Sequence, residues 1–113
     1  MKISNYKITN AKLDALVSYL KARMTFDYEN HSEEMVVLMS EKFYFRNNSK
    51  QINQVIVKKV EKNLLVDVMA GAGGSFLLNI NWLSEKGYIR RVLEIVNSFA
   101  EESSVKVEEI NKD

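Results

Sequence analysis

The stretch QINQVIVKKVEKNLLVDVMA, residues 51–70, decides the fold that we expect of this chain. Its first half, Gln51–Val60, is rich in β-branched residues, and its second half alternates apolar side chains around Asp67. Both features are typical of β-strands. The polar EKN between the halves, Glu61–Asn63, is short enough to join antiparallel neighbours. The stretch therefore predicts two consecutive strands of an antiparallel sheet.

Other segments extend this sheet on both sides. Met35–Phe45 is rich in β-branched and aromatic residues, and the polar NNSK that follows it indicates a turn. Phe76–Trp82 alternates apolar and polar residues and predicts a further strand. Weaker strand signals lie at Lys2–Ile8, Thr25–His31 and Val105–Ile110.

Two segments have the 3.6-residue period of amphipathic helices, and each is expected to cover a face of the sheet. The first begins at about Thr9, whose hydroxyl we expect to cap the helix, and runs to about Met24. The second is SEKGYIRRVLEIVNSFAEE, residues 84–102, with Ser84 as the expected N-cap. The prediction is one α+β domain, residues 1–113, in which an antiparallel meander of about five to six strands packs with an N-terminal helix and a long C-terminal helix.

Composition excludes several classes of protein. The chain has 16 Lys and Arg against 15 Asp and Glu, so we do not expect a dedicated nucleic-acid binder. It has no cysteine, which removes disulfides, thiolate nucleophiles and Cys-ligated zinc. No apolar run approaches the roughly 18 residues that span a bilayer, and the start does not resemble a signal peptide. A cytoplasmic protein without membrane contact is expected.

Three of the four glycines, Gly71, Gly73 and Gly74, lie within MAGAGGSF, residues 69–76. A dinucleotide-binding loop needs its glycines between a strand and a helix, whereas the residues that follow here alternate like a strand. A P-loop also needs a Lys-Ser/Thr pair after the glycines, and that pair is absent. We therefore expect a hairpin turn with a bulge, and the alternatives are an anion-binding nest or close contact with a partner.

No group of residues predicts catalysis or metal binding. His31 is the only histidine, and the neighbouring Ser32, Glu33 and Glu34 would have to converge in space to form a triad. A single histidine also fails the usual spacing of zinc ligands. Asp67 interrupts an apolar strand, and its period places it on the face opposite Val66 and Val68, so exposure is expected. We predict no enzyme, no cofactor and no metal site.

Two groups of polar residues are candidate contacts for a ligand or partner. EKFYFR, residues 41–46, places Lys42, Tyr44 and Arg46 on one strand face, a weak basic and aromatic surface. Asn79 and Asn81 alternate in the strand predicted after the glycines, and asparagine is depleted in strands, so they indicate a polar surface.

The residues EKFYFR and the later GAGG and NINW segments resemble a small bacterial family of the domain-of-unknown-function type, over about residues 36–99. That resemblance implies a bacterial, cytoplasmic, single-domain protein and no particular activity. The expected topology also resembles a reduced helix-grip fold, in which a curved antiparallel sheet wraps a long C-terminal helix. In larger proteins of that fold an apolar ligand occupies the space between the sheet and the helix.

Two functions follow as hypotheses. The first is a non-enzymatic binding or protein-interaction module, including a homodimer formed through a face or an edge of the sheet. The second is a carrier of a small apolar ligand, with a pocket between the sheet and the C-terminal helix at Tyr88–Ala100.

Overall fold

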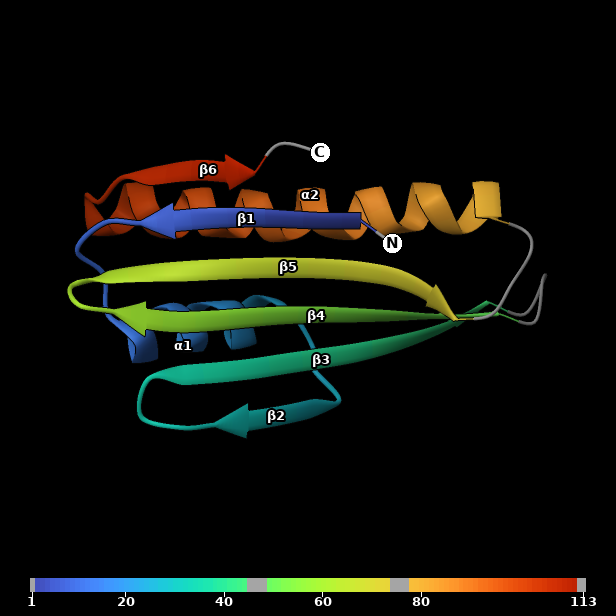
Figure 1. The fold of residues 1–113 in the computed structure, drawn as a ribbon, viewed down its shortest axis with the longest axis horizontal. Coiled ribbons are helices and arrows are strands. Elements are labelled where there is room, and N and C mark those ends of the chain that lie inside the picture. Colours follow the sequence, from blue (N-terminus) through green and yellow to red (C-terminus); the bar gives the residue numbers. More distant parts are fainter. Residues whose placement is uncertain (1, 45–48, 74–77, 112–113) are drawn as a thin grey trace.

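The computed structural model describes residues 2–44, 49–73 and 78–111 as a sheet with two helices (Figure 1). In chain order the elements are β1 (Lys2–Ile8), α1 (Leu13–Arg23), β2 (Tyr28–His31), β3 (Met35–Tyr44), β4 (Ser49–Val60), β5 (Asn63–Gly73), α2 (Leu78–Ser103) and β6 (Val107–Asn111). The α+β class, with an antiparallel sheet and helices near both ends of the chain, is as predicted.

The sheet combines a meander with two added strands. Its order is β2-β3-β4-β5-β1-β6, and every neighbouring pair is antiparallel. The four central segments of the chain, β2 to β5, follow one another across the sheet, and β1 and β6 lie beyond β5 (Figure 1). The three weaker strand predictions are therefore confirmed as β1, β2 and β6, with shifts of a few residues at the ends of the last two.

Both helices cover the same face of the sheet (Figure 1). Alternate residues of the strands point into one apolar core beneath them, because side chains along a strand alternate between faces. The ring of Tyr19 in α1 meets that of Phe99 in α2 edge-on, with centroids 5.4 Å apart. The core strand residues are Tyr6, Ile8, Val36, Leu38, Val55, Val57, Leu64, Val66 and Val68. The other face of the sheet has no helix among the described residues.

The segment after the glycines differs from the prediction. Residues 78–82 begin α2, so the expected strand Phe76–Trp82 and the expected hairpin with the preceding strand are wrong there, and Ser84 lies inside the helix rather than capping it. The reason is that both edges of β5 are already paired with other strands. Strand β5 pairs with β4 on one side and with β1 on the other, which leaves no free edge for a hairpin partner.

The start of α1 also differs, at Leu13 instead of Thr9. The backbone N–H groups of Thr9 and Ala11 donate to the carbonyls of Lys106 and Lys62, at 3.0 and 3.1 Å. Asn10 between them has a φ of 56°, which turns the chain away from the helical path. The left-handed conformation of Asn10 interrupts the helical path, so the helix begins only after it, and Lys12 at the N-cap makes no side-chain capping bond.

Candidate interaction surface on the open face of the sheet

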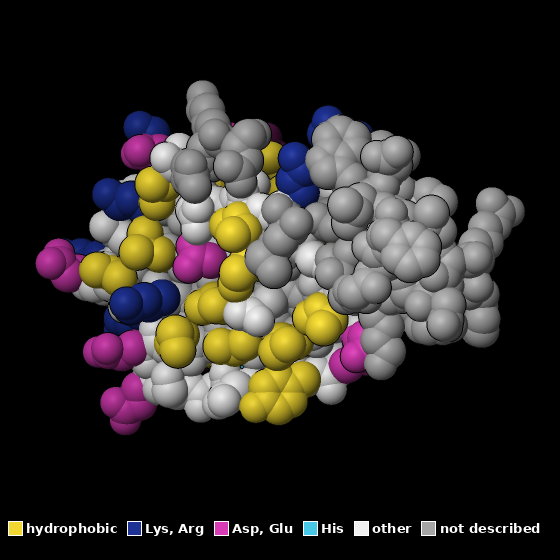
Figure 2. Space-filling model, turned by 45° about the vertical axis from the view of Figure 1, so that its right-hand side comes forward, with side chains coloured by type: hydrophobic (Ala, Val, Ile, Leu, Met, Phe, Trp, Pro, Cys, Tyr) yellow, Lys and Arg dark blue, Asp and Glu magenta, His cyan; other side chains and the backbone are white. Residues whose placement is uncertain are grey.

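The face of the sheet opposite the helices carries many apolar side chains, and we call it the open face. Cross-strand pairs place Tyr28 beside Met39, and Val37 beside Ile56, on this side. Met69 and Ile3 pair in the same way on β5 and β1. Figure 2 shows hydrophobic side chains gathered on the described surface in this region, with charged side chains among and around them.

Several of these side chains are well exposed. Tyr28 is 53% exposed, Ile52 44%, and Met35 and Val60 40% each. The other apolar residues of the open face are half-buried, namely Ile3, Val37, Met39, Ile56, Leu65 and Met69. Large contiguous apolar patches on a monomer mark sites of interaction, whereas isolated exposed apolar residues do not. Here the register places the apolar residues in adjacent rows across the sheet, and Gln54, Lys58 and Asp67 interrupt those rows.

Methionine is concentrated on this face. Met35, Met39 and Met69 are three of the five methionines in the chain. The thioether side chain is unbranched and adaptable, and methionine-rich surfaces are used where a protein must fit a partner. A small hollow of about 130 Å³ lies between Tyr28, Met39 and Ile52 at the β2 side of the face.

Charged residues of both signs lie among the apolar ones. Lys58 and Lys7 flank Leu65 from the two neighbouring strands. Asp67 lies two residues along β5 and accepts a hydrogen bond of 2.5 Å from the Nδ2 group of Asn5 on β1. Asp67 lies on the side of the sheet where the alternation predicted it, but it is half-buried rather than exposed as expected.

The sequence-predicted contact residues lie at one end of the sheet where the structure describes them. Lys42 pairs with Gln51 and Tyr44 with Ser49, while Gly71 pairs with Ile52 and Gly73 with Lys50. The ends of β3 and β5 are thus brought together on either side of β4. Arg46 and Gly74 lie outside the described residues.

Asn79 and Asn81 lie in the first turn of α2 rather than in a strand, so the polar strand face predicted from them is wrong. The sequence analysis excluded a dinucleotide-binding loop because a strand was expected after the glycines, and that reason no longer holds, since a helix follows them. A second ground replaces it: β5 is antiparallel to both neighbours, whereas that loop belongs to a parallel βαβ unit.

The residues around His31 do not form a triad. Nε2 of His31 lies 2.9 Å from Oε1 of Glu29, and Nζ of Lys21 lies 2.9 Å from the same oxygen. The hydrogen bond to His31, together with Lys21, lowers the pKa of Glu29. The Ser32 hydroxyl donates to the carbonyl of Met35 within its own turn. Among the described residues, no group of three metal-ligating side chains is present.

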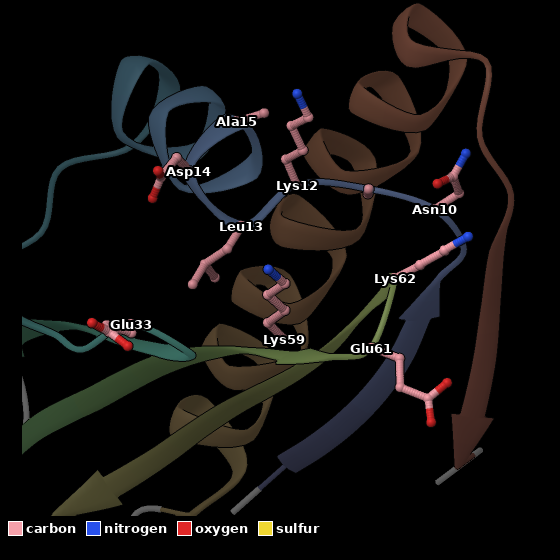
Figure 3. Close-up of a pocket in the computed structure, with 10 residues that line it drawn as sticks. Asn10, Lys12, Leu13, Asp14, Ala15, Glu33, Lys59, Glu61 and Lys62 are labelled. Atoms are coloured by element: carbon pink, nitrogen blue, oxygen red, sulfur yellow. The ribbon is translucent and has the colours of Figure 1, made fainter.

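A charged hollow lies at the other end of the molecule, between the start of α1 and the turn that joins β4 to β5 (Figure 3). Lys12, Lys59 and Lys62 line it together with Asp14, Glu33 and Glu61. Figure 3 shows Lys59 directed from the sheet toward α1, while Glu61 points away from the other side chains. The hollow is open, and its charges are balanced in number.

A polar group interrupts the core beneath α2. Gln51 and Asn53 are 1% and 4% exposed, and the Nε2 group of Gln51 donates to Oδ1 of Asn53 at 2.7 Å. The Tyr88 hydroxyl is also buried and has no hydrogen-bond partner of acceptable geometry among the described residues. Burial raises the pKa of Tyr88, and the neighbouring Ser40 partly opposes that rise.

Comparison with known proteins adds no family to this geometry, since no protein-family model and no curated protein matches the chain. In the part of the chain that the structure describes, neither helix is long and apolar enough to cross a membrane.

The apolar character of the open face was missed by the sequence analysis, although the sequence contains a signal for it. A strand with one wet face alternates apolar and polar residues, whereas a strand with two apolar faces has a continuous apolar run. Met35–Met39, Val55–Val57 and Leu64–Val66 are such runs on neighbouring strands. Each run predicts that the second face of its strand is apolar as well.

Proposed function

We propose that this chain is a non-enzymatic protein-interaction module of the bacterial cytoplasm that binds its partner through the open face of the sheet. The observation that carries the proposal is the set of exposed apolar residues on one uncovered face, with Tyr28 and Ile52 the most exposed. Water contact with such side chains is unfavourable, and burying apolar area contributes about 25 cal/mol per Å².

The surroundings of Ser32 and His31, the residues most often used in catalysis, favour a binding role over an enzymatic one. The hydroxyl of Ser32 is bonded within its own turn, and the ring of His31 is bonded to Glu29 at the edge of the sheet. Neither lies in a concave site with a base or nucleophile beside it, which is the arrangement that covalent catalysis requires.

The test is the oxidation of methionines by dilute peroxide, followed residue by residue with mass spectrometry. A partner on the open face covers Met35, Met39 and Met69, so their oxidation in an extract of the expressing cells is expected to be several-fold slower than in dilute pure protein. Met24, at the end of α1 on the other side, is the internal control and keeps its rate. Equal rates for the three open-face methionines in the extract and in pure protein dilute enough to be monomeric would contradict the proposal.

The alternative is a ligand carrier with its site between the sheet and α2. The observation in its favour is the buried Tyr88 hydroxyl, which a ligand with a hydrogen-bonding group would satisfy. Further along α2 the interface is filled, because Val92 and Val96 are 0% exposed against a core of strand residues. Native mass spectrometry of freshly purified protein tests the carrier, since a retained small molecule adds its mass to that of the chain.

A further inference from the structure

We propose that the partner on the open face is a second copy of this chain, and that the two sheets pack face to face about a twofold axis lying between them. The inference rests on the proposed function, because it names the partner of the same surface. A twofold dimer uses one patch on both subunits, so the patch must be complementary to itself.

The size of the open face fits this partner. The molecule measures 43 × 26 × 20 Å, and the sheet spans the two longer dimensions (Figure 1). These dimensions outline a face on the order of 1,000 Å², and a standard stable interface covers about 800 Å² on each partner. The face of a second copy is therefore of the size that a stable dimer needs.

The distribution of charge on the open face points to a copy of itself. A phosphate-rich partner requires an excess of positive charge, whereas Asp67 lies in the interior of this face. Lys58 and Lys7 lie one row away from Asp67 and on either side of its strand. A surface that carries both signs in adjacent rows is able to meet its own image with opposite charges in contact.

The rows also indicate where the twofold axis lies. An axis that runs across the strands between the row of Asp67 and the row of Leu65 exchanges these two rows between the copies. Asp67 of each copy then lies over Leu65 of the other, within the space flanked by the Lys7 and Lys58 of that copy. The bond from Asn5 holds the carboxylate in place before association, which lowers the entropy lost on binding.

The edges of the sheet are less suited to a second copy. Strand β2 is only four residues long, and beyond its end the carboxylate of Asp27 accepts the backbone N–H of Glu41 on β3 at 2.8 Å. At the opposite edge, β6 is only five residues long and carries Glu108 and Glu109, of which Glu108 pairs with Lys106 at 3.7 Å. Short strands and edge charges are the usual protection against edge-to-edge pairing.

Sedimentation equilibrium of the purified chain tests the inference. The expected mass is twice the 13.1 kDa of one chain at micromolar concentration. Ile52→Glu introduces a charge at an exposed position of the open face, and Ile56→Asp introduces one at its centre. Each is expected to raise the dimer dissociation constant at least about tenfold, as loss of a central interface contact does. Ser18→Glu, exposed on α1, is the matched control and is expected to leave the constant unchanged.

A charge exchange tests the position of the axis. Asp67→Lys is expected to weaken the dimer, and combining it with Lys7→Asp and Lys58→Asp is expected to restore it. Circular dichroism of each variant establishes that the fold is retained, and Ile52→Glu provides a change at a position where no core contact is lost.

A monomer at about 100 micromolar, a concentration at which weak complexes of this size are populated, overturns the inference. So does a dimer that Ile52→Glu and Ile56→Asp leave intact, because it must use another surface. A monomer whose open-face methionines are protected in extract removes the second copy and leaves the proposed function standing. A monomer whose open-face methionines are not protected in extract contradicts both the dimer and the proposed function.

Discussion

Gly87 lies inside α2, where glycine is the least favourable residue after proline. A Cβ added at this position meets no atom within 4 Å. We therefore expect Gly87→Ala to raise the free energy of unfolding by about 0.5–1 kcal/mol, because the unfolded chain loses conformational freedom and the helix gains a better former. Urea unfolding followed by circular dichroism measures the change. Gly87→Ser should gain less, and a loss of stability in Gly87→Ala would contradict the expectation.

Single residues could be predicted from the sequence where their role depends on near neighbours in the chain. The alternation around Asp67 placed its side chain on the correct side of β5. Its half-burial and its bond to Asn5 could not be predicted, because they require β1 to lie beside β5, a pairing between segments about 60 residues apart. The chain alone does not reveal which distant strand supplies the neighbour.

At the scale of one element, α1 attaches to the core through Leu13, Leu16, Val17 and Leu20, all buried. Leu20 is 0% exposed, so Leu20→Ala is expected to lower the free energy of unfolding by about 2–5 kcal/mol, from lost transfer energy and the cavity left behind. Denaturant unfolding measures the loss. Ser18→Ala, on the exposed side of the same helix, is the control and should change stability by less than about 0.5 kcal/mol. A loss below 1 kcal/mol for Leu20→Ala would show that α1 is not docked as described.

The elements were predictable where one period continued over a long segment. The apolar stripe of α1 and the run from Tyr88 to Ala100 in α2 both have the helical period, and both are helical. Residues 78–82 were predicted as a strand because a short alternating run fits either structure. Only the pairing of β5 on both sides decides between them, and that pairing belongs to the whole sheet.

For the whole molecule, the sequence predicted the class and the order of the elements better than the surface that we propose for binding. The sequence analysis assigned Val37 and Ile56 to strands and did not say which face of the sheet they occupy. Which face of a sheet becomes the core depends on where both helices pack. Here both pack on one side, so the second apolar face is left open (Figure 1). That choice is made by tertiary packing and not by any local pattern.

Stability of the whole fold at alkaline pH depends on its buried tyrosines. Burial raises the pKa of Tyr6, with a smaller contribution from Glu109, while Ser4 opposes the shift. Burial likewise raises the pKa of Tyr88. The unfolded chain then loses these protons at a lower pH than the folded chain, so the free energy of unfolding falls as pH rises above about 10. Below that pH the contribution of both hydroxyls is fully present.

We expect Tyr6→Phe and Tyr88→Phe each to reduce this alkaline loss, since phenylalanine carries no proton to release. Urea unfolding at pH 8, 9, 10 and 11 measures it, because the range spans the ordinary tyrosine pKa of about 10. Tyr28→Phe, at the exposed position on β2, is the matched control. Between pH 8 and pH 9 the free energy of unfolding should change little in the wild type and in both variants. Above pH 10 it should fall faster in the wild type than in either variant. A parallel loss in wild type and both variants would place the alkaline transition on other groups.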